Sequence, residues 1–397
     1  MTDRRSRRRT SITHATWTLA SALVACGGGP SHVEHPPEAD DRVERAAEAW
    51  ASLDATTAAR LADEALRISE DPRAAEIAAR AHLALFENER AVAALEGRSE
   101  PELVQLRALA QIAADDYEGA LASLHAAIAR QRDEDPLTLA LEPAIAAALE
   151  RGARYEVVGE PASVELVSTT LPIVRVRVDA VETLALIGSG TQLAVLDPSV
   201  RREPGAIDEL GLGSLRVRNV PHLVRSLEAV RQTLGVEVGA VLGTDLLFAL
   251  HARIDGPGGR VRFGASPEPS PEGSTHASLR MLSGSFLAVE ARLGRQPAWL
   301  TVDTSGLFPI ALTPTAAEGL GIAEDEWTSA EGGLAMFVAP AVRIGALEVE
   351  GLPLVRGLLT DEHARAAAAP VAGSVGWTLL AQLVTRFDRE NRTLAFE

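Results

Sequence analysis

Apolar residues follow a helical period through the first part of the chain. From Arg42 to about Gly152 they recur at positions i, i+3 and i+4 among Ala, Leu, Glu and Arg, with almost no Gly or Pro. This spacing places the apolar side chains on one face of a helix. The pattern therefore predicts an all-α domain over residues 42–152.

Small residues within this region suit hairpins of two packed helices. The run from Leu103 to Pro136 fits one helix-turn-helix unit, with Ala108 in its first helix and Tyr117, Ala120, Leu124 and Ala127 in its second. Similar spacing recurs at Ala58, Ala62 and Ala65. The spacing resembles tetratricopeptide repeats, which stack such hairpins, although their early Trp and closing Pro are missing. A plain helical bundle is the alternative.

Beyond Tyr155 the period of the apolar positions changes to two. Val174, Val176 and Val178 alternate with arginines, as the two faces of a half-buried strand do. We expect strands, turns and short helices from there to the end of the chain. Prolines and polar residues mark a linker over 265–276, which favours extended, loosely packed backbone and divides this region into parts spanning 155–264 and 277–397.

The two parts beside the linker are copies of each other. The first contains Val241-Leu242-Gly243-Thr244-Asp245-Leu246-Leu247, and the second contains Ser374-Val375-Gly376-Trp377-Thr378-Leu379-Leu380. The same number of residues separates Gly243 from Gly376, Asp255 from Asp388 and Phe263 from Phe396. The sequence therefore predicts a duplicated unit.

Each copy begins with a strand that runs into a tight turn. The first turn reads Ile187-Gly188-Ser189-Gly190, and the second reads Val302-Asp303-Thr304-Ser305-Gly306. Apolar residues before Asp-Thr-Gly, followed much later by an apolar-Gly-x-x-Leu-Leu run, resemble the retropepsin-like and pepsin-like aspartic proteases. The resemblance covers about Val164 to Glu397. It implies an all-β, two-lobed acid-protease-like domain in which each lobe gives one Asp to a shared catalytic pair.

The chemistry of that family needs two carboxyl groups. Two carboxylates a few ångströms apart cannot both ionise, so one keeps a proton while the other activates the attacking water. Asp303 stands at the catalytic position of the second copy, but the first copy has Gly188 or Ile187 at the matching position. The next acid, Asp197, we expect to cap a helix that begins at Pro198.

Other residues take supporting roles through the resemblance. Thr304, Ser305 and Gly306 continue the turn after Asp303, and Gly188, Ser189 and Gly190 form the matching turn, where Ser189 can hydrogen-bond across the interface. The segment around Gly332 and Gly333 falls where the family places a flap over the substrate. A plain hairpin turn explains these two glycines equally well.

Charge and histidine spacing exclude several kinds of partner. The formal net charge is −17, and the arginines of the amino-terminal segment are counted in it. Nucleic acids and anionic surfaces require a cationic face, so we expect neither as a partner. The histidines have no ligand-like spacing, and we predict no metal site and no cofactor.

The first residues resemble a bacterial lipoprotein signal. Arginines between Arg4 and Arg9 precede a short apolar stretch that ends in Leu23-Val24-Ala25-Cys26-Gly27, which is similar to a lipobox. Cys26 is the only cysteine, so it has no disulfide partner in the chain. We expect a signal peptide over 1–25, a lipid on Cys26 and a flexible tether over 26–41. The resemblance implies anchoring in the cell envelope, at an outer membrane facing the periplasm.

Two functions remain open from the sequence. The first is a lipid-anchored aspartic-type peptidase homologue with degenerate or weak endopeptidase activity, because Asp303 is the single recognisable catalytic Asp. The second is a non-catalytic envelope lipoprotein that binds peptides or proteins through the helical repeats and the former substrate cleft. Fold and site evolve separately, so loss of catalysis does not require loss of binding. The group that faces Asp303 across the interface between the lobes distinguishes these two functions.

Overall fold

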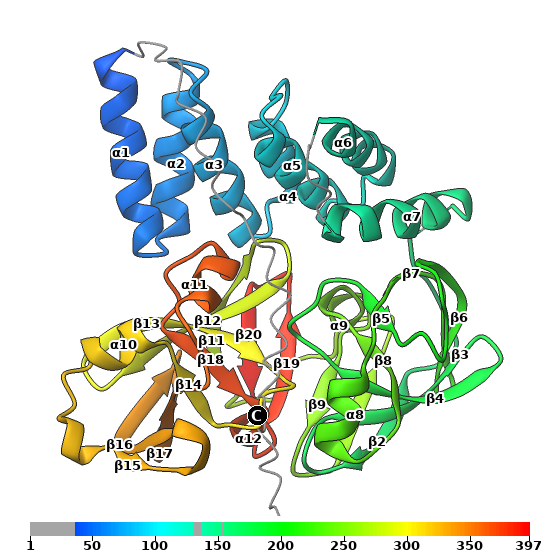
Figure 1. Ribbon diagram of the computed structural model, residues 1–397. Helices are drawn as coiled ribbons and strands as arrows, with labels where there is room; N and C mark the ends of the chain where they lie inside the picture. Colours follow the sequence, from blue (N-terminus) through cyan, green and yellow to red (C-terminus); the bar gives the residue numbers. More distant parts are fainter. Residues whose placement is uncertain (1–35, 131–135, 153) are drawn as a thin grey trace, which may run out of the picture.

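The computed structural model describes residues 36–130, 136–152 and 154–397 (Figure 1). In these residues a helical domain precedes a β-rich domain, which confirms the predicted α + β class. The predicted signal segment and the lipidation site Cys26 lie outside the described residues. None of the described helices combines the length and apolarity that a bilayer crossing requires.

Consecutive helices pack side by side in the helical domain. Ala58, Ala62 and Ala65 are fully buried, because small side chains let neighbouring helices approach closely. The helices are α1 (Pro37–Ala51), α2 (Ala55–Leu66), α3 (Pro72–Ala84), α4 (Asn88–Ala94), α5 (Pro101–Ala113), α6 (Tyr117–Arg130) and α7 (Pro136–Glu150).

The start of α1 corrects one predicted boundary. The helix begins at Pro37, within the segment expected to be a tether, because proline suits the first helical position. Ala39 is buried there, and Asp40 forms an ion pair of 2.6 Å with Arg73 of α3. These contacts hold a segment whose composition alone predicted no order.

Two lobes form the β-rich domain, and their equivalent elements follow the same order, with one extra strand in lobe 1 and four extra short elements in lobe 2. Lobe 1 contains β1 (Glu156–Val158), β2 (Ala162–Ser168), β3 (Ile173–Val178), β4 (Val181–Ile187), β5 (Ala194–Leu196), β6 (Gly205–Leu212), β7 (Leu215–Val224), α8 (Glu228–Leu234), β8 (Val238–Leu242), α9 (Thr244–Ala249), β9 (Arg253–Asp255) and β10 (Arg260–Phe263). Lobe 2 contains β11 (Thr275–Leu282), β12 (Phe286–Leu293), β13 (Gln296–Asp303), β14 (Ile310–Leu312), α10 (Pro314–Gly319), η1 (Glu324–Glu326), β15 (Thr328–Ser329), η2 (Glu331–Gly333), β16 (Ala335–Ile344), β17 (Leu347–Arg356), α11 (Glu362–Ala367), β18 (Gly373–Gly376), α12 (Trp377–Leu380), β19 (Val384–Asp388) and β20 (Thr393–Phe396).

An interlobe sheet joins the two lobes through their main chains. Its strand order is β2, β10, β9, β19, β20, β11, and every neighbouring pair is antiparallel. The order is symmetric, because β9 pairs with its counterpart β19 at the centre. In Figure 1 this sheet lies between the green lobe 1 and the yellow-to-red lobe 2.

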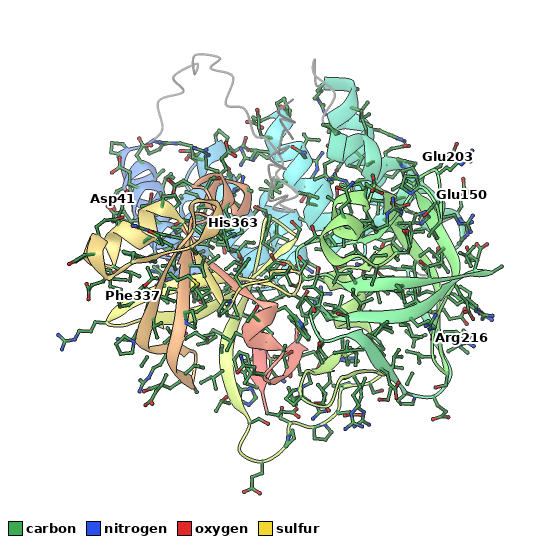
Figure 2. All side chains as sticks on the ribbon, turned by 60° about the horizontal axis from the view of Figure 1, so that its bottom comes forward. Asp41, Glu150, Glu203, Arg216, Phe337 and His363 are labelled. Carbon is green, nitrogen blue, oxygen red and sulfur yellow. The ribbon has the colours of Figure 1, made fainter. Side chains whose placement is uncertain are left out.

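The helical domain packs against both lobes (Figure 1). Leu53 and Leu85 share an apolar cluster with Leu282 and Phe286 of lobe 2. On the other side α7 packs against β6 and β7, and Figure 2 shows Glu150 of α7 near Glu203 of lobe 1 at this junction. The helices therefore span the division between the lobes.

Side-chain contacts hold the predicted linker. Arg386 of β19 donates hydrogen bonds to the Glu268 carbonyl and to the Ser270 hydroxyl, and Arg262 forms an ion pair of 2.8 Å with Glu268. The segment is therefore held against the interlobe sheet at these points.

Candidate functional site

Asp303 is the last residue of β13, at the start of the turn between β13 and β14 of lobe 2. β13 runs parallel to β18, with Asp303 opposite Gly376, and β14 returns antiparallel to β18. The Asp303 carboxylate accepts hydrogen bonds from the Ser305 amide at 2.9 Å and from the Ser305 hydroxyl at 2.5 Å. These bonds hold the carboxylate in place within its own turn.

Lobe 1 has the same arrangement of strands, but its turn contains no acidic residue. β4 runs parallel to β8, with Ile187 opposite Leu242, and β5 returns antiparallel to β8. The Gly188 amide donates a hydrogen bond of 2.9 Å to the Leu242 carbonyl. The turn therefore leaves the strand directly after Ile187.

Reciprocal hydrogen bonds join the two turns. The Ser189 amide donates to the Thr304 hydroxyl and the Thr304 amide donates to the Ser189 hydroxyl, each at 3.0 Å. The Ser189 hydroxyl donates to the Val302 carbonyl at 2.7 Å, and the Thr304 hydroxyl donates to the Ile187 carbonyl at 2.6 Å. Ser189 and Thr304 therefore occupy equivalent positions, which makes Gly188 the counterpart of Asp303.

Two glycines lie behind these turns. A Cβ atom at Gly243 would overlap the carbonyl oxygen of Gln192, and one at Gly376 would overlap the carbonyl oxygen of Phe308. No side chain fits at either position, because the obstructing atoms belong to the main chain. The apolar-Gly runs thus pack directly against the main chain at the turns or just after them.

The surroundings of Asp303 favour its neutral form. Burial raises the pKa of Asp303, and the hydrogen bonds from Ser305 and the Gly306 amide oppose this effect only in part. Within the described part of the chain, Asp303 forms no ion pair, and no charged side chain contributes to this pKa shift. Among the described residues, no second carboxyl group therefore affects the pKa of Asp303 as a paired acid would.

Val241 occupies the space beside Gly188. A Cβ atom at position 188 would overlap Cγ1 of Val241. The equivalent residue in lobe 2 is Ser374, since Leu186 lies opposite Val241 and Thr301 lies opposite Ser374. The role of Val241 was not predicted, although aligning the two copies of the sequence places a valine against a serine at this position.

The remaining predicted residues lie apart from the paired turns. Gly332 and Gly333 have φ values of 75° and 80° and lie between the antiparallel strands β15 and β16, a position compatible with both the flap and the plain hairpin turn. The expected helix at Pro198 is wrong, because residues 198–200 form a turn. Asp197 instead accepts hydrogen bonds from Ser199 and from the Leu227 amide, which precedes α8. No group of residues suited to a metal ion occurs in the described ranges.

The joined turns allow a test of their contribution to stability. Ser189→Ala should lower the free energy of unfolding by about 1–3 kcal/mol, because the Thr304 amide loses its buried acceptor. Thr304→Val should have a similar cost, because the Ser189 amide then loses its own acceptor. The two changes share only the 3.3 Å hydrogen bond between the two hydroxyl groups, so the double variant should cost nearly the sum of the two. Urea unfolding measures all three, with Ser189→Thr as the variant that keeps a hydroxyl. Single variants without a cost would contradict the reciprocal arrangement.

Comparisons with known proteins give similarity to solved structures only. No family model matches the sequence, and no curated protein matches it. A retropepsin-like aspartic protease from Rickettsia conorii is similar with 19% identity and a TM-score of 0.24, over 31% of this chain and 89% of that chain. Basic 7S globulin from soybean is similar with 12% identity and a TM-score of 0.40, over 61% of this chain and 95% of that chain. These similarities concern the fold alone.

Proposed function

We propose that the β-rich domain is a homologue of aspartic peptidases whose catalytic pair is incomplete, so that it cleaves peptides weakly or not at all. The observation that supports this proposal is that Gly188 occupies the position equivalent to Asp303, as the bonds between Ser189 and Thr304 indicate. Hydrolysis of this type divides the work between a protonated and an ionised carboxyl group. Asp303 supplies only one of these two carboxyl groups.

The packing beside Gly188 supports a lasting loss of the second acid. Val241 is buried and its methyl group occupies the space that a side chain at position 188 would need. A larger residue at 188 would require Val241 to shift, because overpacking strains a core. The packing in lobe 1 therefore favours glycine at this position.

The raised pKa of Asp303 bears on the part that this residue can play. A general base must be ionised, whereas burial raises the pKa of Asp303 and favours the protonated form. A protonated carboxyl group donates one hydrogen bond and accepts others. The direction of the shift therefore favours hydrogen bonding by Asp303 over removal of a proton from water.

Incubation with an unstructured peptide library, from acidic to neutral pH, tests this proposal. We expect the unaltered protein and Asp303→Asn to give the same peptide profile. Asp325→Asn is the matched control, because it removes an exposed carboxylate of η1 in lobe 2. Cleavage by the unaltered protein and by Asp325→Asn, but not by Asp303→Asn, would overturn the proposal of an incomplete catalytic pair.

A further inference from the structure

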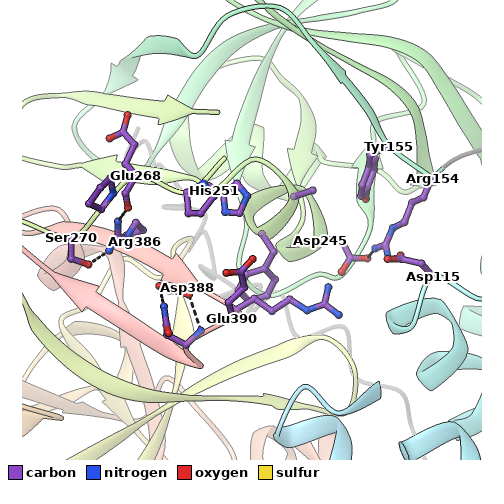
Figure 3. Close-up of a pocket in the computed structure, with 16 residues that line it drawn as sticks. Asp115, Arg154, Tyr155, Asp245, His251, Glu268, Ser270, Arg386, Asp388 and Glu390 are labelled. Carbon is purple, nitrogen blue, oxygen red and sulfur yellow. Dashed lines mark hydrogen bonds and ion pairs between the residues drawn. The ribbon is translucent and has the colours of Figure 1, made fainter. Parts of the chain in front are cut away.

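A cavity of about 530 Å³ lies where the helical domain, both lobes and the linker meet (Figure 3). Its lining combines segments that are distant in the sequence: Asp115 between α5 and α6, Arg154 and Tyr155 before β1, Asp245 of α9, Glu268 and Ser270 of the linker, and residues 386–391 from the end of β19 onward. A second cavity of about 650 Å³ shares Asp115, Arg154 and Tyr155 with it. Both volumes fall in the usual range for small-molecule sites.

Two buried arginines in this cavity have unused donors. The side chain of Arg154 is 10% exposed, forms ion pairs with Asp115 and Asp245, and lies over the ring of Tyr155 at 4.9 Å. Arg386 is 5% exposed. The Nε atoms of both arginines are buried without a hydrogen-bond partner. These two Nε atoms are also shielded from the cavity, so Arg154 and Arg386 contribute positive charge to its wall and no donor that a ligand can reach through Nε.

The same lining carries one cation and one anion without ion-pair partners. Arg389 donates a hydrogen bond of 3.1 Å to the Ala113 carbonyl, and in the described part of the chain it contacts no carboxylate within ion-pair distance. Burial lowers its pKa, which indicates incomplete compensation of its charge. Glu390 is exposed and forms neither an ion pair nor a side-chain hydrogen bond with any described residue. Figure 3 shows Glu390 within the ring of lining residues.

The mixture of charges restricts the ligand. A purely anionic compound would meet the carboxylates of Asp245, Asp388 and Glu390, and a purely cationic one would meet three guanidinium groups. We propose that this cavity binds a small zwitterion, an amino acid or a short peptide, with its carboxylate held by Arg389 and its ammonium group held by Glu390. Asp303 is not among the lining residues, so this site does not depend on the proposed function of the paired turns.

Calorimetric titration of the full chain with L-alanyl-L-alanine tests the proposal. The matched probes are N-acetyl-alanyl-alanine, which lacks the ammonium group, and alanyl-alanine amide, which lacks the carboxylate. We expect each blocked compound to bind at least about tenfold more weakly, since each loses charge-assisted hydrogen bonds. Maltose, a neutral compound with many hydroxyl groups, should not bind. Equal binding of all four compounds, or no binding of the dipeptide at millimolar concentration, overturns the proposal.

Substitutions assign the binding to this cavity. Glu390→Gln should weaken binding of the dipeptide by about tenfold and leave binding of the acetylated probe unchanged, because only the ammonium contact is lost. Arg389→Gln should weaken both. Glu350→Gln, at an exposed carboxylate of β17, is the control and should change neither. Thermal unfolding of each variant checks the fold, and dipeptide binding that Glu390→Gln and Arg389→Gln both leave intact overturns the assignment.

Discussion

The double variant Gly188→Asp, Val241→Ser is expected to cleave unstructured peptides in acid at least about 100-fold faster than the unaltered protein. This is the lower limit of what a positioned acid or base contributes to catalysis. The new carboxyl group would face Asp303, because the bonds between Ser189 and Thr304 already align the two turns. Peptide cleavage over a range of pH, followed by mass spectrometry, measures the gain.

The second substitution is needed for steric reasons. An aspartate at position 188 would overlap Cγ1 of Val241, whereas lobe 2 accommodates Asp303 with Ser374 at the equivalent position. Two neighbouring carboxyl groups titrate as a pair, so we expect a bell-shaped dependence of the rate on pH. Gly188→Asp without the change at Val241 should show less activity and lower stability, because overpacking strains a core.

Two controls separate the pair from other effects. Val241→Ser alone should show no gain, since it adds no carboxyl group. Adding Asp303→Asn to the double variant should abolish the gain, because one acid again lacks its partner. Activity that survives this third substitution would mean that the gain does not come from the pair of acids. A folded double variant without any gain would mean that more than one acid is missing from this site.

Arg154→Met should destabilise the protein by about 3–5 kcal/mol, the usual cost of removing one partner of a buried ion pair. The change leaves Asp245, which is 7% exposed, without its ion-pair partner. It also removes the cation from the ring of Tyr155 and the contact with Asp115. Urea unfolding at neutral pH measures the loss, and Arg60→Met, at an exposed arginine of α2, is the control.

The loss should depend on pH in a defined direction. Burial raises the pKa of Asp245 even against the opposing charges of Arg154 and Arg389. A carboxyl group whose pKa is higher in the folded state than in the unfolded state destabilises the fold above its unfolded value, and this cost disappears as the pH falls. The difference between Arg154→Met and the unaltered protein should therefore shrink in acid. A loss that is the same at neutral and acidic pH would contradict the role of Asp245.

Periodicity was sufficient to predict the classes of structure and the order of the two regions. The helical period before Gly152 and the alternation after Tyr155 show which side chains of each segment are buried, and this pattern can be recognised in the sequence itself. The duplication placed Gly243 and Gly376 at equivalent points, and the structure shows both against a turn. What the sequence left open was whether Gly188 or Ile187 matches Asp303, because hydrogen bonds between distant turns decide it.

Contacts between distant segments explain the remaining differences. The start of α1 depends on an ion pair with Arg73 in α3. Asp197 was expected to cap a helix directly after it, but it binds the main chain before α8. The ion pair between Arg154 and Asp245 joins residues that only the packing of α9 brings together. Local patterns carry no information about such partners, so none of these features could be predicted from spacing.

The central pairing of β9 with β19 makes the two halves of the duplication inseparable. Each half alone would leave three strands ending in an open edge, with the hydrogen-bonding groups of β9 or β19 facing water. Such an edge is a template for pairing with another chain. Joining both copies in one polypeptide satisfies that edge internally, and a gene encoding a single lobe should therefore yield a product that self-associates.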